Sequence, residues 1–178
     1  MKAFDDMKRH LVIALDPSYA ALGWARVFAD GQPEVIASGA MSYSHRKAKA
    51  EEKFPGIIRD FGQILDEWLS LYEAQQYTVA IEHSWHGKNA ATASKLAELR
   101  GGLLAVALCA NCKILRVTPR EWQVASDIPM RADRAMVKRM SRAIALRRTG
   151  KLAMSEDEAD AINIGVCAAG VVRIGDLA

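Results

Sequence analysis

One uninterrupted apolar segment near the N-terminus constrains the fold of this 178-residue chain more than any other feature. It extends from Leu11 to Leu15 and is followed directly by Asp16 and Pro17. A short apolar run of this kind predicts a central strand of a sheet. Proline holds the residue before it in extended geometry and has no N–H for the next ladder hydrogen bond, so the strand should end at Asp16. We therefore expect an acidic side chain at the end of a central strand.

The remaining segments alternate between strand and helix patterns. Turn residues at 30–33 favour an antiparallel hairpin between the second and third strands. A polar, lysine-rich connection over 42–53 leads to Pro55 and Gly56, after which the first helix is expected. Further strands are expected at about 21–28, 34–41, 78–81 and 113–117, and helices at about 57–69, 89–110, 132–148 and 155–171.

This order of elements predicts the α/β class, with a mixed five-stranded sheet flanked by helices, in a single domain over residues 8–172. Gly101 and Gly102 interrupt the helix expected at 89–110 and indicate a bend or the close approach of another backbone. Trp24 and Trp68 are expected in the core.

Composition excludes several classes of protein. Apolar residues make up 51% of the chain and charged residues 25%, the balance of a soluble globular protein. The net charge of +3 does not by itself establish nucleic-acid binding. The N-terminal residues do not show the basic, then apolar, then small-residue pattern of a leader, and no apolar run approaches the roughly 20 residues that span a bilayer, so we expect a cytoplasmic protein with no membrane partner. Cys109 and Cys112 lack two further zinc ligands and are interpreted as thiols near a helix end.

Four carboxylates are arranged so that they can meet. Asp16 ends the first strand and Glu82 ends the fourth, so both emerge at one edge of the sheet if these strands are parallel neighbours. Asp157 and Asp160 lie three positions apart on a predicted helix and share a face. The apolar positions of this helix, which should dock it on the sheet, are Ala161, Ile164 and Ala168.

Converging carboxylates repel one another, and divalent cations that prefer oxygen ligands, Mg²⁺ or Mn²⁺, offset that repulsion. Two such ions, about 3.5–4 Å apart in one site, activate a water and stabilise the leaving oxygen in phosphodiester hydrolysis. The alternative is that Asp157 is an early-helix residue favoured by the helix dipole, as its neighbours Glu156 and Glu158 are. The carboxylates alone leave both interpretations open.

The motifs around these residues resemble those of bacterial RuvC Holliday-junction resolvases, which have an RNase H-like fold. The resemblance extends from about Leu11 to Ala169, with the motifs in the family's order. The matching segments are 13–17 with Gly23-Trp24-Ala25, Ile81-Glu82 with Lys88-Asn89, Leu96 and Arg100-Gly101, Thr118-Pro119, 130–137, and 156–162, which contains the Asp-x-x-Asp-Ala motif.

The resemblance implies that Asp16, Glu82, Asp157 and Asp160 are the catalytic, metal-binding quartet of a homodimer that cuts symmetry-related strands of a four-way junction. Two features depart from the cellular enzymes. Ser18 stands where a glycine is usual, and the connection over 42–55 is longer. They leave the quartet intact, put the cleavage-sequence preference in doubt and suit a phage-encoded enzyme acting in a bacterial cell. The helix at 89–110, with small residues on its surface, is the candidate dimer interface.

Basic residues form a candidate DNA-binding face. Arg131, Arg134, Lys138 and Arg142 share one stripe of a predicted helix, and Arg120 adds positive charge near its start. The alternative is an ordinary solvated helix face.

The segment after Glu82 holds further candidates for DNA contact. The resemblance assigns Trp85 as an aromatic wedge that stacks on a base at the junction centre, and Lys88 and Asn89 as DNA contacts. Core packing is the alternative for Trp85. The nearby His83 and His86 are not assigned a role.

The sequence therefore predicts a structure-selective endonuclease that gives paired symmetric nicks in four-way junctions. One alternative is an RNase H-like nuclease for other branched DNA or RNA. Another is a non-catalytic junction-binding module, against which the four acids argue, because such a module gains nothing from negative charge where phosphates dock. A phosphotransfer enzyme of the actin and sugar-kinase fold is disfavoured by the short chain and the lack of a glycine-rich phosphate loop.

Overall fold

The computed structural model describes residues 10–43, 49–72, 74, 76–83 and 90–175. A five-stranded sheet with the strand order β3-β2-β1-β4-β5 forms its centre. The β1–β2 and β2–β3 pairs are antiparallel, whereas the β1–β4 and β4–β5 pairs are parallel. The predicted α/β class and mixed sheet are confirmed. The strands are β1 (His10–Pro17), β2 (Ala21–Phe28), β3 (Glu34–Ser42), β4 (Gln76–Glu82) and β5 (Lys113–Val117).

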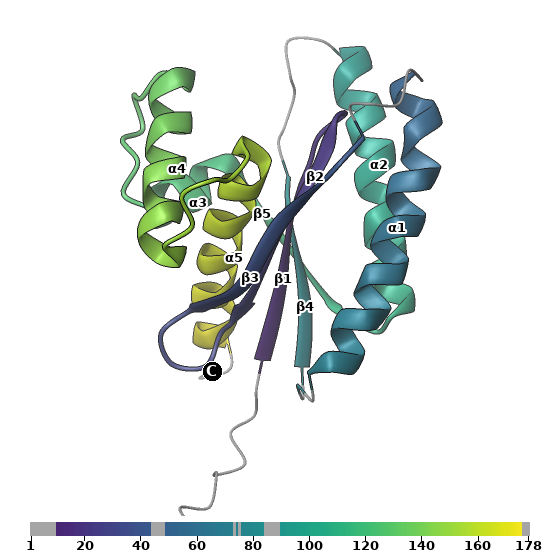
Figure 1. Ribbon diagram of the computed structural model, residues 1–178, viewed down its shortest axis with the longest axis horizontal. Coiled ribbons are helices and arrows are strands. Elements are labelled where there is room, and N and C mark those ends of the chain that lie inside the picture. Colours follow the sequence, from purple (N-terminus) through teal and green to yellow (C-terminus); the bar gives the residue numbers. More distant parts are fainter. Residues whose placement is uncertain (1–9, 44–48, 73, 75, 84–89, 176–178) are drawn as a thin grey trace, which may run out of the picture.

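Helices cover both faces of the sheet (Figure 1). One face carries α1 and α2, and the other carries α5, with α3 and α4 beside it. No helix among the described residues is long and apolar enough to cross a membrane. The helices are α1 (Ala50–Leu71), α2 (Ala90–Cys109), α3 (Pro119–Ala125), α4 (Arg134–Thr149) and α5 (Glu156–Gly175).

The central strand β1 is buried on both faces. Leu11, Ile13 and Leu15 belong to the core beneath α1 and α2, and Val12 and Ala14 belong to the core beneath α5. None of the five has exposed surface. Because each face of β1 has its own layer of helices, successive positions are apolar instead of alternating.

The tryptophans expected in the core pack against each other on the α1 side of the sheet. Trp68 is 6% exposed, and its ring centroid lies 4.7 Å from that of Trp24. Gly102 also lies on this side, where an added Cβ would sit 2.2 Å from Ile58 Cδ1 of α1. The close neighbour at Gly102 is therefore a side chain of α1 and not the backbone that the sequence led us to expect, and a Cβ at Gly101 would meet nothing within 4 Å.

Helix α5 lies close to the sheet at two glycines, against side chains at Gly165 and backbone to backbone at Gly23. A Cβ at Gly165 of α5 would lie 2.8 Å from Val27 Cγ2 and 3.1 Å from Ala14 Cβ. A Cβ at Gly23 of β2 would lie 2.0 Å from the carbonyl oxygen of Asp157. The predicted docking face of this helix is confirmed. Its members Ala161, Ile164 and Ala168 have no exposed surface.

Two elements differ from the expectation. α1 begins at Ala50, and Pro55 lies inside it instead of before it. The Glu52 carboxylate accepts a hydrogen bond from Lys49 N at 3.2 Å and so stabilises the first turn. Proline removes one helical hydrogen bond. Burial of the apolar face of α1 outweighs that loss.

The sequence-based expectation missed α3, because it placed no element between the strand at 113–117 and the helix at about 132–148. Thr118 Oγ1 accepts a hydrogen bond from Glu121 N at 3.3 Å, and Glu121 Oε2 accepts one from Thr118 N at 2.6 Å. This reciprocal capping box, with proline at the first helical position, is a sequence signature of a helix start. The signal was present in the sequence.

The contact at Gly23 can be tested by adding one methyl group. We expect Gly23→Ala to lower the free energy of unfolding by about 1–3 kcal/mol, because the Cβ would overlap the backbone of α5. Urea denaturation followed by circular dichroism measures the change. Gly170→Ala is the control: a Cβ at Gly170 of α5 meets nothing within 4 Å, and alanine favours a helix. Equal stability of Gly23→Ala and the unchanged protein would contradict the close packing.

Candidate active site

The four predicted carboxylates meet at one end of the sheet. Asp16 is near the end of β1 and Glu82 is the last residue of β4. β1 and β4 pair in parallel with Leu15 opposite Ile81, so the two acidic residues follow side by side. The first turns of α5 bring Asp157 and Asp160 to the same edge, where Gly23 opposite Asp16 lets the helix approach.

The pKa shifts of these side chains are consistent with their position at one edge of the sheet. Burial raises the pKa of Asp16 well above its usual value, and the charges of Glu82, Asp160 and Asp157 raise it further. Arg100 of α2 lowers the same pKa. The sheet therefore holds Asp16 among three acidic side chains, in the arrangement predicted from strand polarity and helical spacing.

Each of the other three carboxylates lies next to a side-chain hydroxyl or an indole N–H. Burial raises the pKa of Glu82, and Trp122 Nε1, which donates to Glu82 Oε2 at 3.0 Å, lowers it. Burial raises the pKa of Asp160 to about 6, opposed by a hydrogen bond that Ser141 Oγ donates to Asp160 Oδ1.

Burial likewise raises the pKa of Asp157, whose Oδ2 lies 3.5 Å from Ser18 Oγ. Ser18, the residue that departs from the family pattern, therefore lies at the edge of the site. Its hydroxyl oxygen accepts a hydrogen bond from Ala21 N at 3.0 Å, which holds it in the β1–β2 turn.

Sequence reasoning missed Trp122 and Ser141. Trp122 lies on the unpredicted helix α3 and is 2% exposed. Ser141 lies on α4 and is 1% exposed. A serine beside the apolar positions Met140 and Ile144 was a signal for a buried hydrogen bond, but the sequence does not name its partner 19 residues away.

The donor set suits a divalent cation that prefers oxygen. It consists of carboxylates whose burial and mutual repulsion a cation would offset. Within the described residues, no three Asp, Glu, His or Cys side chains already surround a single point as ligands. The carboxylates lie within electrostatic range of one another, while Glu82 and Asp160 face Trp122 and Ser141.

The predicted DNA-binding residues divide into two groups. Trp85, Lys88 and Asn89 lie outside the described residues, so their roles stay predictions. The others lie on α3, on α4 or just before α4. Arg120, Arg131, Arg134 and Arg142 are exposed, and Lys138 is partly buried.

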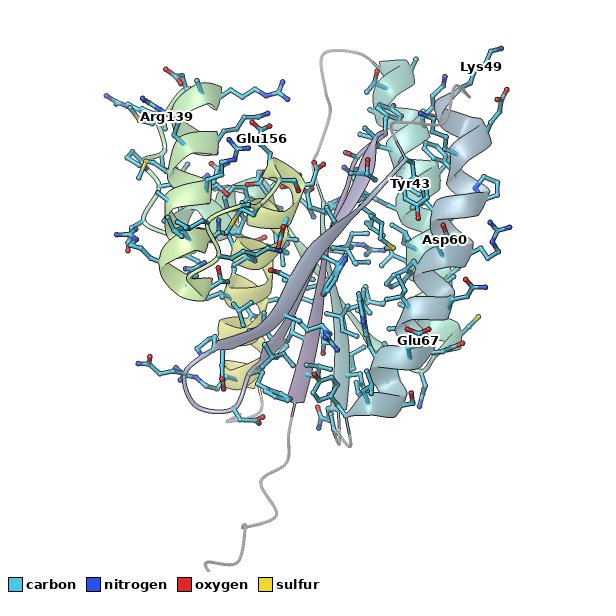
Figure 2. The ribbon with its side chains drawn as sticks, in the orientation of Figure 1. Tyr43, Lys49, Asp60, Glu67, Arg139 and Glu156 are labelled. Carbon is cyan, nitrogen blue, oxygen red and sulfur yellow. The ribbon has the colours of Figure 1, made fainter. Side chains whose placement is uncertain are left out.

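Lys138 of α4 forms an ion pair with Glu156 at the start of α5. Figure 2 labels Glu156 at this end of α5, next to α4. The hydrogen bond from Lys138 lowers the pKa of Glu156 most, and the positive charges of Arg142 and Arg134 lower it further. An acidic side chain therefore lies against the basic stripe. Arg142 also lines a cleft of about 880 Å³ between β3 and the connection from α4 to α5, which none of the four carboxylates lines.

The raised pKa of Asp160 predicts a pH-dependent stability in the absence of metal ions. The folded-state pKa of about 6 lies above the ordinary value of 3.8. The folded protein therefore binds this proton more tightly than the unfolded chain does. The resulting contribution to the free energy of unfolding is complete below about pH 3.8 and is lost as the pH rises through about 6. In EDTA at pH 7.5 we expect Asp160→Asn to be more stable than the unchanged protein by up to about 3 kcal/mol.

Thermal or urea unfolding in EDTA at pH 4 and pH 7.5 measures this difference. The two proteins should converge in stability at pH 4, because both then carry a neutral group at position 160. Asp66→Asn, an exposed site on α1, is the matched control and should show little difference at either pH. A less stable Asp160→Asn at pH 7.5 would mean that the charged carboxylate stabilises the fold.

The sequence model of the family described as "Crossover junction endodeoxyribonuclease RuvC" matches residues 12–168. Among curated relatives, RuvC of Natranaerobius thermophilus is 25% identical over 165 residues, which cover 92% of this chain and 97% of that protein. RuvC of Halorhodospira halophila is 28% identical over 157 residues, which cover 88% and 87%.

Solved structures show the same fold. RuvC of T. thermophilus, in complex with a Holliday junction substrate, matches with a TM-score of 0.70 and 20% identity, covering 93% of this chain and 96% of that one. The yeast mitochondrial Holliday junction resolvase Ydc2 matches with a TM-score of 0.58 and 11% identity, covering 91% and 77%. The RNase H-like fold expected from the sequence is confirmed.

Proposed function

The chain belongs to the RuvC family of crossover junction endodeoxyribonucleases, and we propose that it resolves four-way DNA junctions at the site formed by Asp16, Glu82, Asp157 and Asp160. The observation that supports this site is the meeting of two strand ends and the first turns of α5 at one edge of the sheet. In α/β sheets, ligands bind at the carboxyl ends of the strands.

The four carboxylates would hold the metal ions, two in each site, as Mg²⁺ or Mn²⁺. Such ions supply an activated water and stabilise the leaving oxygen during phosphodiester hydrolysis. The chain's own contribution is placement. Asp16 and Glu82 are fixed by adjacent strands, and Asp157 and Asp160 by a helix in backbone contact with β2. Hydrogen bonds from Trp122 and Ser141 orient Glu82 and Asp160.

Cleavage of a labelled synthetic four-way junction tests the function. We expect paired symmetric nicks that require Mg²⁺ or Mn²⁺ and leave a matched linear duplex whole. Asp157→Asn should lower the cleavage rate by more than about 100-fold, since it removes a metal ligand, while it keeps junction affinity in Ca²⁺. Asp66→Asn, on the far face of the sheet, should cleave normally.

Full activity of Asp157→Asn would refute the assignment of the quartet. Preferred cutting of forks or RNA–DNA hybrids would keep the quartet and change the substrate. Binding without cutting in both metals would leave a junction-binding protein.

The exposed basic side chains Arg120, Arg131, Arg134 and Arg142, together with Lys138, are proposed to contact DNA phosphates. The stripe on α4 lies beside the start of α5, which carries two of the carboxylates. Phosphates bound there would lie next to the cutting site. Lys138 would exchange Glu156 for a phosphate when DNA binds.

Two substitutions on this face should change the affinity for a four-way junction in opposite directions. Arg134→Ala should weaken junction binding and reduce the slope of log affinity against log salt by about 1. Glu156→Gln should strengthen binding, because it releases Lys138 from its ion pair. Arg59→Ala on α1 is the control on the opposite face. Fluorescence anisotropy in Ca²⁺ across a salt series measures both. An unchanged affinity in both variants would remove α4 from the DNA interface.

A homodimer through α2 is proposed to supply the two sites needed for paired nicks. Ala97, Gly101 and Ala105 follow one another on the exposed side of α2, and Leu108 beyond them is 62% exposed. Small side chains permit close approach of a second helix, and Leu108 would add an apolar contact at the end of this surface.

Gly101→Arg tests this interface. Gly101 is exposed, and a Cβ there meets nothing within 4 Å inside one protomer, so the fold should tolerate a larger side chain. We expect light scattering to show a monomer, and cleavage to give single nicks instead of paired ones. Gln63→Arg on the exposed side of α1 makes the same change in charge and should leave the dimer intact. A dimer that survives Gly101→Arg would place the interface elsewhere. Cytoplasmic location and phage origin stay predictions from the sequence.

A further inference from the structure

Polar side chains of α4 and α5 form a line across the interface between these two helices, and the line ends at Asp160 of the candidate site. Asn163 has no exposed surface and Ser141 is 1% exposed. Ile162 and Ile164, which flank Asn163, and Ile144 and Ala145, one turn after Ser141, are buried apolar residues of the same core. Burying an amide and a hydroxyl in such surroundings is unfavourable unless each finds a hydrogen-bond partner. The partners here form one connected chain.

Three contacts link Arg148 to the active site. Arg148 Nη1 donates to Asn163 Oδ1 at 2.6 Å. Asn163 Nδ2 donates to Ser141 Oγ at 2.8 Å and to Ser141 O at 3.1 Å. Ser141 Oγ donates to Asp160 Oδ1. The positions match the helical repeat: Asp160 and Asn163 are one turn apart on α5, and Ser141 and Arg148 are two turns apart on α4.

The direction of every hydrogen bond in this chain is determined by its first member. A guanidinium group can only donate, so it must face the oxygen of the Asn163 amide. The amide nitrogen then faces Ser141, and it also can only donate. The Ser141 hydroxyl has a single hydrogen and must accept from the amide, so that hydrogen is left for Asp160. Arg148 therefore determines, through the orientation of the Asn163 amide, that the Ser141 hydroxyl donates its hydrogen to the Asp160 carboxylate.

We propose that Arg148, Asn163 and Ser141 form a positioning relay that fixes the rotamer of the Asp160 carboxylate. Ser141 engages Oδ1, which leaves Oδ2 directed to the metal-binding site assigned under the proposed function, on which this inference rests. None of the three residues touches the substrate. They act through Asp160, by removing its freedom to rotate before ions and DNA bind.

The chain contains a matched contact outside the site. Ser38 Oγ donates to Glu158 Oε1 at 2.7 Å, and Glu158 is 4% exposed on the same helix α5. Lys151 pairs with the same oxygen at 2.6 Å. Ser38→Ala therefore removes a serine-to-carboxylate hydrogen bond of the same kind without touching the quartet.

The test compares Mn²⁺ binding and cleavage in Ser141→Ala, Asn163→Leu, the double variant and Ser38→Ala. In the first two, we expect about 10–100-fold weaker Mn²⁺ binding to the DNA-free protein by calorimetry, and the same rise in the Mn²⁺ concentration for half-maximal cleavage. Junction affinity in Ca²⁺ should be unchanged. Because Asn163 acts through Ser141, the double variant should be no worse than Ser141→Ala alone. Ser141→Thr, which keeps the hydroxyl, should restore Mn²⁺ affinity.

Several outcomes would overturn the relay. One is Mn²⁺ affinity in Ser141→Ala equal to that in Ser38→Ala. Another is strictly additive losses in the double variant, which would indicate two independent structural roles. If Asn163→Leu does not fold, Ser141→Ala and Ser141→Thr decide the question by themselves. Asp160→Asn separates this inference from the proposed function. If Asp160→Asn cleaves normally, the quartet itself is wrong. If it is inactive while Ser141→Ala binds Mn²⁺ normally, only the relay is wrong.

Discussion

Backbone contact between α5 and the sheet is the constraint on which the site depends. Gly23 of β2 leaves no room for a Cβ beside the carbonyl of Asp157, and Gly165 allows the next turns of the helix to lie on β1 and β2. Because Gly23 is also the ladder partner of Asp16, one contact joins the helix that carries two acids to the strand that carries another. The parallel pairing of β1 with β4 adds Glu82. A larger residue at Gly23 would separate the two halves of the site.

Four buried, neighbouring carboxylates repel one another, and hydrogen bonds within the fold offset this repulsion only in part. Burial and the charges of the other carboxylates raise the pKa of Asp16 most. For each of the other three carboxylates, burial is the largest cause of the raised pKa. Trp122 and Ser141 each donate one hydrogen bond, to Glu82 and to Asp160. These donors oppose the shift and also orient the carboxylates. The remaining repulsion is what divalent cations would neutralise under the proposed function.

Local patterns in the sequence were sufficient for most of this arrangement. The apolar run before Asp16 indicated a central strand, the short run before Glu82 a second one, and the three-residue spacing of Asp157 and Asp160 a shared helix face. The capping signal of Thr118 and Glu121 was overlooked, and with it the helix that carries Trp122. The contacts of Ser141 with Asp160 and of Lys138 with Glu156 depend on how α4 packs on α5. A single sequence holds no direct signal for such packing.

Diffraction from crystals of the unchanged protein soaked in Mn²⁺, measured at a wavelength where manganese scatters anomalously, tests the central claim most directly. The account predicts two anomalous peaks about 3.5–4 Å apart, bounded by the carboxylates of Asp16, Glu82, Asp157 and Asp160, with Asp160 Oδ1 still engaged by Ser141. Anomalous density bound to other residues, in a protein that cleaves junctions with Mn²⁺, would contradict the assignment of these four side chains as the catalytic metal site.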